Sequence, residues 1–410
     1  MFTTGAIPQL NLDLIQTLAI AGLIFLTGMM LNKKISFLGR LNIPSAVLGG
    51  LIFTAVNLIL HDRFLNIKVN TSMQSLCMML FFTSIGTNAS LGLLKKGGKQ
   101  VMLFLVLSSV FCILQNLVGI GVATLFGVPK LFGVMAGSVT LVGGPATGLA
   151  FAPLFEEMGL KGAETIAITA ATFGIVLGGL LGGPAATFLV NKFRLANNTK
   201  QPVTSVETNP EVNDETLRVD ITHENSGFTM SLVNIGIIMG LGSAVSFFIA
   251  KSGVTLPAYI GAMIVGAVFR NINDKKAFTV LDQQTIDFAG GIALNIFLTV
   301  ALMDLRLWEL FHLALPLTGI LLAQLIVVIL FALSITYAVM GKNYEAAVMS
   351  GGFIGFMLGT VANAMAVMKT VANKYGVAPR AFLVVPLVGG FFIDYVNALV
   401  ITVFANFLGP

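Results

Sequence analysis

The sequence predicts an all-helical integral membrane protein with ten transmembrane helices in two inverted five-helix repeats, each with a re-entrant hairpin loop. Three observations lead to this prediction: the composition, a set of long apolar segments, and two glycine-rich stretches in corresponding places of the two halves. Of the 410 residues, 56% are hydrophobic and only 10% are charged. Because a soluble protein of this size carries roughly 25% charged residues, we expect the chain to cross a membrane many times.

Apolar segments of about 20 residues are long enough to span a bilayer. Ten segments are expected to do so, at residues 14–31, 44–60, 72–94, 100–126, 165–190, 229–250, 255–269, 286–303, 311–339 and 381–408. No basic residue precedes the first segment, whereas Lys33, Lys34 and Arg40 follow it. This is the reverse of a signal peptide. We therefore expect an uncleaved first helix and both termini outside.

Two glycine-rich stretches, near 131–155 and 345–368, remain between these spans. Irregular backbone at membrane depth is tolerated only inside protein or beside a water-filled cavity, so we expect these stretches to wall a binding site. If both re-enter the membrane without crossing it, most lysines and arginines fall on one side. If both cross, the basic residues divide almost equally. The positive-inside rule therefore favours two re-entrant loops.

Residues 192–227 change abruptly to Asn, Thr, Lys, Glu and Asp. Such a segment buries too little apolar surface to fold by itself, which predicts a flexible cytoplasmic linker. It divides the chain into a first repeat at 1–191 and a second repeat at 228–410.

The two halves share short matches in the same order. Residues 46–56 resemble 258–268, and residues 127–137 resemble 341–351. Because each half has an odd number of spans, the second half would enter the membrane from the opposite side. Inverted repeats with interrupted segments are typical of transporters with a site near the midplane.

The candidate substrate-binding residues are hydroxyls, glycines and one amide at the two loop tips. Glycine lets the backbone approach a ligand closely, and a helix that starts at a chain break presents N–H groups and the positive end of its dipole to an anion. These residues are Ser138, Thr140, Gly143, Gly144, Thr147, Gly359, Thr360 and Asn363. The alternative interpretation is that they serve only close helix packing.

Asp394 lies inside the last expected span, and Asn397 follows on the same helix face. A carboxylate within a transmembrane helix is costly and normally faces a cavity or an ion, and hard cations prefer oxygen ligands. We expect Asp394 and Asn397 to bind the coupling ion, sodium or a proton, with a buried structural hydrogen bond as the alternative. Because the sequence has no disulfide or zinc spacing, no cofactor is expected beyond that ion.

Three long blocks identify a family. The chain resembles the bacterial sodium/glutamate symporters, most strongly in Phe173–Pro184, Met340–Val348 and Ala381–Val400. The resemblance implies sodium-coupled uptake of glutamate across the bacterial inner membrane by alternating access, and a homodimer with an elevator-like moving domain. At the first loop, Gly143–Gly148 reads Gly-Gly-Pro-Ala-Thr-Gly where the family typically has Gly-Gly-His-Gly-Thr-Gly. At the second, residues 356–362 also depart from the family's Gly-Leu-Gly-Ala-Thr-Pro.

Several other functions are weighed against this prediction. The closest is a sodium- or proton-coupled transporter of another dicarboxylate or amino acid. An ion channel would also use irregular re-entrant backbone, but channels usually complete a pore by rotational symmetry. An intramembrane aspartyl protease would need a second carboxylate facing Asp394, and none is obvious, so no enzyme is expected. The basic residues concentrate in loops, which indicates membrane topology rather than a nucleic-acid partner.

Overall fold

A computed structural model of the chain describes residues 7–35, 38, 43–195, 225–251, 257–306 and 313–408. Of the expected linker at 192–227, residues 196–224 fall outside these residues, so the linker stays a prediction. Apart from a short parallel pair of strands, β1 (Gln9–Asn11) and β2 (Asn66–Lys68), the described elements are helical.

Six helices among the described residues are long and apolar enough to cross a membrane, and a bent pair could add a seventh. The six are α1 (Leu14–Lys34), α6 (Gly98–Leu125), α9 (Ala163–Lys192), Gly227–Lys251 of α10 (Asn225–Lys251), α12 (Gln283–Met303) and Ala314–Val339, which joins α13 (Ala314–Phe331), η3 (Ala332–Thr336) and α14 (Tyr337–Val339). Each coincides with an expected span. The prediction of a helical integral membrane protein is therefore confirmed.

The bent pair lies at the C-terminal end of the chain. It consists of α17 (Pro379–Leu387), the wide π-helical turn η4 (Val388–Phe392) and α18 (Ile393–Leu408), with a bend of 44°. The sequence predicts one continuous span here. The break falls between Gly390 and Ile393, within the π-helical turn, and such turns often mark functional sites.

The other three expected spans are helices that are short or carry charge. They are α3 (Ser45–Leu60), α4 (Ser72–Asn88) and α11 (Ala258–Lys276). The third segment was expected to continue to residue 94, but α4 ends at Asn88 and a separate short helix, α5 (Leu91–Lys96), follows. Their crossing of the membrane, and hence the total of ten spans, stays a prediction.

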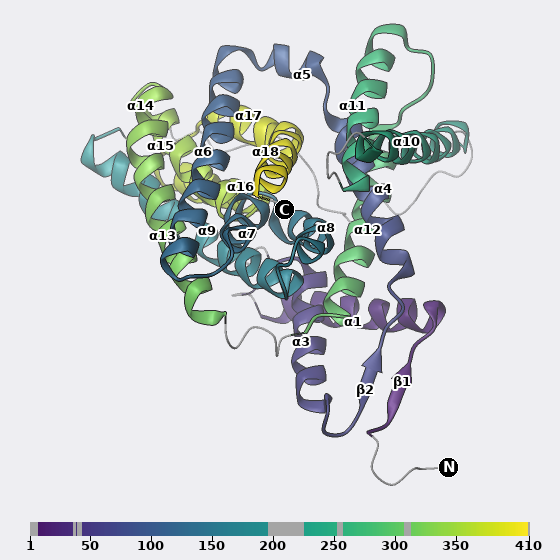
Figure 1. Ribbon diagram of the computed structural model, residues 1–410. Helices are drawn as coiled ribbons and strands as arrows, with labels where there is room; N and C mark the ends of the chain where they lie inside the picture. Colours follow the sequence, from purple (N-terminus) through teal and green to yellow (C-terminus); the bar gives the residue numbers. More distant parts are fainter. Residues whose placement is uncertain are drawn as a thin grey trace.

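The helices form two groups (Figure 1), one of α1, α3, α4, α10, α11 and α12, and one of α6 and the remaining helices of both halves except the short α5, which contacts both α6 and α11. The second group includes the two glycine-rich stretches. The first stretch contains α7 (Lys130–Val134), η1 (Met135–Val139) and α8 (Gly144–Glu157), and the second contains α15 (Tyr344–Met357) and α16 (Val361–Tyr375). Where the groups meet, Phe151 of α8 packs edge-on against Tyr259 of α11, with ring centroids 5.7 Å apart.

The same close helix crossing occurs in both halves. A Cβ atom on Gly28 of α1 would lie 2.8 Å from the Gly49 nitrogen of α3, and one on Gly261 of α11 would lie 2.3 Å from the Gly242 carbonyl oxygen of α10. Gly49 and Gly261 lie at matching positions of the two short sequence matches at 46–56 and 258–268. A side chain at these glycines would force the helices apart, so the repeated residues have a packing reason.

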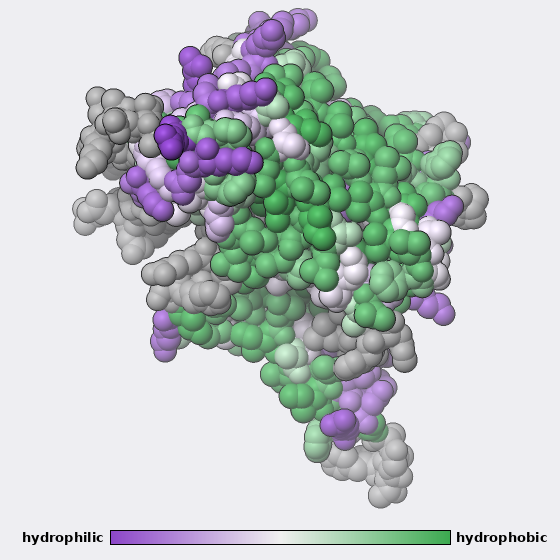
Figure 2. All heavy atoms as spheres, turned by 90° about the vertical axis from the view of Figure 1, so that its left-hand side faces the viewer, coloured by the Kyte–Doolittle hydropathy of each residue, from purple (hydrophilic) through white to green (hydrophobic). Residues whose placement is uncertain are grey.

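The surface matches a bilayer environment. Figure 2 shows a broad apolar face, with most of its hydrophilic residues gathered toward the ends of the molecule. Large hydrophobic side chains such as Leu125, Phe248 and Phe407 are exposed. Contiguous apolar surface on this scale is unusual for a soluble protein.

Candidate functional site

The second glycine-rich stretch is a helical hairpin. A Cβ atom on Gly352 would lie 2.8 Å from Met368 Sδ, and one on Gly355 would lie 3.0 Å from the Ala364 nitrogen. Residue 352 therefore faces 368 and residue 355 faces 364. Because one number rises as the other falls, α15 and α16 run antiparallel. The tip is at residues 358–360.

The hairpin packs on a row of glycines in α9. Cβ atoms on Gly174, Gly178 and Gly182 would lie 2.0, 3.1 and 2.6 Å from the carbonyl oxygens of residues 358, 355 and 351. These glycines recur every four residues and so share one helix face. Backbone approaches this closely to backbone only where a side chain is missing. The packing explains three of the five glycines in the block Phe173–Pro184.

The first glycine-rich stretch contains two breaks in its helix. Gly137, inside η1, has φ −104° and ψ −129°, outside the helical region, and Gly144 has a left-handed φ of +66°. Pro145 occupies the first turn of α8, where its missing N–H costs nothing. Thr140 folds back within the break and donates its hydroxyl to the Met135 carbonyl at 2.8 Å. The tip of this stretch is therefore at residues 140–143.

The two tips meet at Gly174. A Cβ atom there would lie 2.8 Å from Leu141 Cδ2 of the first tip and 2.0 Å from the Leu358 carbonyl oxygen of the second. Helices α8 and α16 each begin three residues after these two leucines. Two helix N-termini thus come together near one point of α9, an arrangement that favours an anion.

Two neighbouring amide side chains on α6 each form a hydrogen bond with the backbone of one glycine-rich stretch. Gln115 Nε2 donates to the Met357 carbonyl at 2.9 Å, just before the second tip. Asn116 Oδ1 accepts from the Ser138 N–H of the first stretch at 3.0 Å. A third amide, Gln324 Nε2 of α13, donates to the Gln115 carbonyl at 2.6 Å. All three side chains are buried.

These amides were not among the expected site residues. The available signal was two adjacent amides, Gln115 and Asn116, inside an otherwise apolar span. Because buried amides in a membrane need partners, such a pair indicates a contact with irregular backbone.

Ser138 is held from two sides. Its N–H is bound by Asn116, and its carbonyl oxygen accepts from Asn397 Nδ2 of α18 at 2.9 Å. Ser138 Oγ and Asn397 Oδ1 are both buried and have no hydrogen-bond partner among the described residues. The structure thus brings one expected substrate residue and one expected sodium residue into direct contact.

Asp394 lies one turn before Asn397, in the first turn of α18. Its carboxylate lies near the buried thiol of Cys112, which is one turn before Asn116 on α6. Asp394 is half-buried and accepts no hydrogen bond from the part of the chain that the structure describes. The unpaired oxygens of Ser138, Asn397 and Asp394 are of the kind that suits a hard cation.

The expected residues of the second tip make local contacts. Thr360 caps α16 by accepting the Asn363 N–H at 3.3 Å, and Asn363 Nδ2 donates to the Ile175 carbonyl of α9 at 2.7 Å. A Cβ atom on Gly359 would lie 2.6 Å from Asn363 Nδ2. Asn363 Oδ1 is buried without a partner among the described residues, so one polar atom at this tip remains open to a ligand.

The other expected residues of the first tip lie close together. Thr147 sits in the first turn of α8, and its side chain fills the space beside Gly143, where a Cβ atom would lie 2.4 Å from Thr147 Cβ. Thr147 and Gly144 are buried and Gly143 is partly exposed. Small residues are therefore needed here for the turn itself, whatever the ligand.

We expect Asn116→Ala to lower the free energy of unfolding by about 1–3 kcal/mol, because it leaves the Ser138 N–H buried without a partner. Thermal unfolding of the purified protein measures this. The matched control is Ser109→Ala on the same helix, whose hydroxyl donates only to its own helix, at Leu105. Equal stability of the two variants would contradict the assigned role of Asn116.

Comparisons with known proteins decide the family. The model for the sodium/glutamate symporter family matches residues 10–377. The chain belongs to this family. Its relatives include the sodium/glutamate symporters of Escherichia coli strain K12 and Shigella flexneri, each 38% identical over 398 residues that cover 96% of this chain and 98% of the relative. The symporter of Haemophilus influenzae is 37% identical, covering 95% and 96% of the two chains.

Family membership confirms the resemblance seen in the three sequence blocks. A symporter moves solutes across a membrane and makes or breaks no covalent bond in them, so membership also confirms that this protein is not an enzyme. Sodium is the coupling ion of a sodium/glutamate symporter, and no further cofactor is indicated. The matched region includes both hairpin tips, Gly174 and both α6 amides.

Proposed function

We propose that this protein takes up glutamate with sodium by alternating access, and that it binds the substrate where the two hairpin tips meet. The observation that carries the proposal is the joint approach of Leu141 and Leu358 to Gly174. It places the N-termini of α8 and α16 near one point, where their N–H groups and dipoles suit the carboxylates of glutamate. Substrate-binding roles are proposed for Ser138, Thr140, Gly143, Gly144, Thr147, Gly359, Thr360 and Asn363.

The proposed sodium site lies beside this point. Asp394 supplies the negative charge, and Asn397 Oδ1 and Ser138 Oγ supply neutral oxygens. Because Ser138 belongs to the first hairpin and Asn397 to α18, a bound ion would tie the two elements together. Sodium can drive the cycle only by binding one conformation more tightly than another, and a site built from two separate elements provides such a difference.

The proposed topology has ten spans in two inverted repeats and two re-entrant hairpins, with both termini outside the bacterial inner membrane. The antiparallel packing of α15 on α16 and the matching glycine crossings Gly28–Gly49 and Gly242–Gly261 support it. The two helix groups would act as a scaffold and an elevator-like moving part. A homodimer is also part of the proposal, and the mass of the purified protein in detergent would test it.

Cysteine labelling separates re-entrant from crossing stretches. In a cysteine-free background, we expect Lys130→Cys and Lys161→Cys, at the two ends of the first hairpin, to react with an impermeant reagent in cells whose outer membrane alone is opened. Lys342→Cys and Lys374→Cys, at the ends of the second, should react only after the inner membrane is opened. All four lysines are exposed. A stretch that crosses the membrane fully would show its two ends on opposite sides.

Uptake into proteoliposomes tests the function itself. With an inward sodium gradient, we expect radiolabelled glutamate to accumulate and the rate to saturate; with a proton gradient alone it should not accumulate. Pro145 and Ala146 depart from the family pattern at the first tip, so aspartate and other dicarboxylates belong in the same experiment as competitors. If another carboxylate accumulated and glutamate did not, the substrate would be that carboxylate. A flux that does not saturate would favour a channel.

A further inference from the structure

An open groove of about 430 Å³ lies between the two helix groups. Leu91 of α5 and Val268 and Ile272 of α11 line one side, and Phe392 and Tyr395 line the other. The lining is therefore mostly apolar, and α11 on one side and the start of α18 on the other belong to different helix groups.

Two lysines line the same groove. Lys275 and Lys276 stand in the last turn of α11 and are exposed. Neither takes part in an ion pair with any residue that the structure describes. The nearby Arg270 differs, since its Nε binds Asp274 Oδ1 at 2.7 Å and its Nη1 donates to Gln283 Oε1 at 2.6 Å. The positive charge available at the groove is therefore that of the two lysines.

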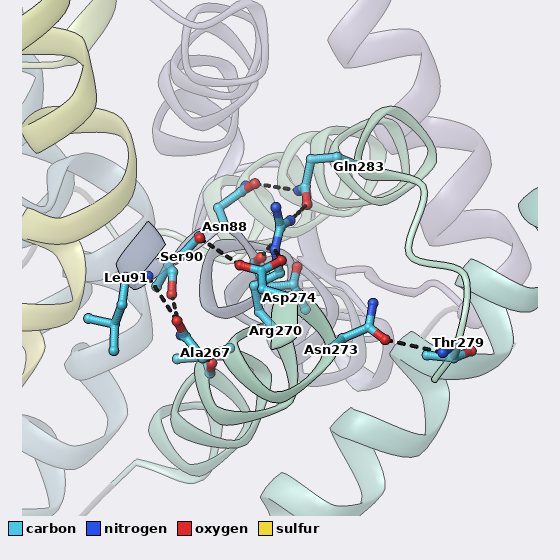
Figure 3. Close-up of polar contacts among 12 residues, drawn as sticks. Asn88, Ser90, Leu91, Ala267, Arg270, Asn273, Asp274, Thr279 and Gln283 are labelled. Carbon is cyan, nitrogen blue, oxygen red and sulfur yellow. Dashed lines mark hydrogen bonds and ion pairs between the residues drawn. The ribbon is translucent and has the colours of Figure 1, made fainter. Parts of the chain in front are cut away.

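A polar network holds the α11 wall in place (Figure 3). Asn271 Oδ1 accepts from the Leu91 N–H at 2.8 Å, and Asn271 Nδ2 donates to the Ala89 carbonyl at 2.8 Å. Ser90 Oγ donates to Asp274 Oδ2 at 2.6 Å. These bonds fix α11 to the corner between α4 and α5. The lysines thus stand on a wall whose position is set before any ligand binds.

We propose that this groove binds an anionic phospholipid, with an acyl chain along the apolar walls and the phosphate between Lys275 and Lys276. Helix α11 begins in an apolar sequence and ends in charged residues, so its last turn lies at the membrane interface. Basic pockets between transmembrane helices on the cytoplasmic side suit anionic headgroups. The assignment to the cytoplasmic leaflet rests on the topology given under the proposed function. The groove and its two lysines are independent of that topology.

The bound lipid would touch the element that carries the proposed sodium ligand. Phe392 and Tyr395, which form the far wall, flank Asp394 in the sequence at the start of α18. A lipid seated between the groups would therefore contact α11 on one side and the start of α18 on the other. Its presence would favour the conformation in which the two walls lie at this distance.

Native mass spectrometry of the purified full-length protein tests the site, with phosphatidylglycerol and phosphatidylcholine of the same acyl chains as probes. We expect wild type to bind phosphatidylglycerol at least about tenfold more tightly, in line with a headgroup site. The double variant Lys275→Gln/Lys276→Gln should lose this preference. Lys33→Gln/Lys34→Gln, an adjacent lysine pair in the last turn of α1, should keep it.

A second variant tests the apolar part of the groove. Ala267→Phe would fill the space beside Val268 and should weaken binding of both lipids while the lysines remain. Equal loss of preference in the α1 control, or an unchanged preference in the α11 variant, would overturn the proposal. Competition by inorganic phosphate or glutamate at equal concentration would indicate a small-anion site instead. Sodium-driven uptake measured in parallel separates the lipid site from the proposed symport. Lipid selectivity can be absent while symport persists, and symport can be absent while lipid selectivity persists.

Discussion

Replacing Gly174 by alanine is expected to abolish glutamate uptake. The new Cβ atom would lie 2.0 Å from the Leu358 carbonyl oxygen and 2.8 Å from Leu141 Cδ2. The first contact is with backbone, which cannot rotate away, so the tip of the second hairpin must move. Elsewhere in a helix the same change from glycine to alanine stabilises by about 1 kcal/mol, whereas forced overpacking costs about 1–3 kcal/mol.

The matched control for this prediction is Gly183→Ala, because Gly183 lies on the same helix and has open space where the Cβ atom would be. We expect the control to fold and transport as wild type does. The double variant Gly174→Ala/Leu141→Ala should also fail, since removing the leucine side chain leaves the Leu358 carbonyl in the way. Sodium-driven uptake and gel filtration of the purified variants measure both effects. Normal uptake by Gly174→Ala would show that the meeting of the tips is not needed for transport.

Local patterns in the sequence predict much of this architecture. The apolar segments predicted the six long helices because a bilayer fixes the length and polarity of a helix that crosses it. The i, i+4 spacing of Gly174, Gly178 and Gly182 is a visible stripe of small residues. The partner of that stripe is not visible, because a contact between α9 and α15 joins residues far apart in the sequence.

The details of the site depend on such long-range contacts. Asn116 and Asn397 come from different halves of the chain, and only the folded structure shows that both bind the backbone of Ser138. In a strongly apolar segment two amides barely change the mean hydropathy. The span at 100–126 was therefore predicted, but the contacts of its two amides with the glycine-rich stretches were not. The bend before α18 was missed for a related reason, since the segment 381–408 is apolar on average and its mean hydropathy does not show where a helix bends.

Asp394→Asn is expected to weaken sodium binding strongly and with it the sodium-driven accumulation of glutamate. The amide has nearly the same shape and keeps one oxygen, but it carries no charge to balance a sodium ion in a poorly solvated place. Removing one member of a buried charge pair costs about 3–5 kcal/mol, which corresponds to at least about a 100-fold higher sodium concentration for half-maximal uptake. Uptake measured against sodium concentration gives this value directly.

Folding and sodium binding must be separated for this variant. Because Asp394 accepts no hydrogen bond within the described part of the chain, Asp394→Asn should unfold at the wild-type temperature in the absence of sodium. When sodium is added, the wild-type protein should become more stable and Asp394→Asn should not, since an ion that binds only the folded state stabilises it. The control Asp62→Asn removes an exposed carboxylate outside the expected spans and should leave both measurements unchanged. If Asp394→Asn kept its sodium-dependent stabilisation and uptake, the charge for sodium would have to come from elsewhere.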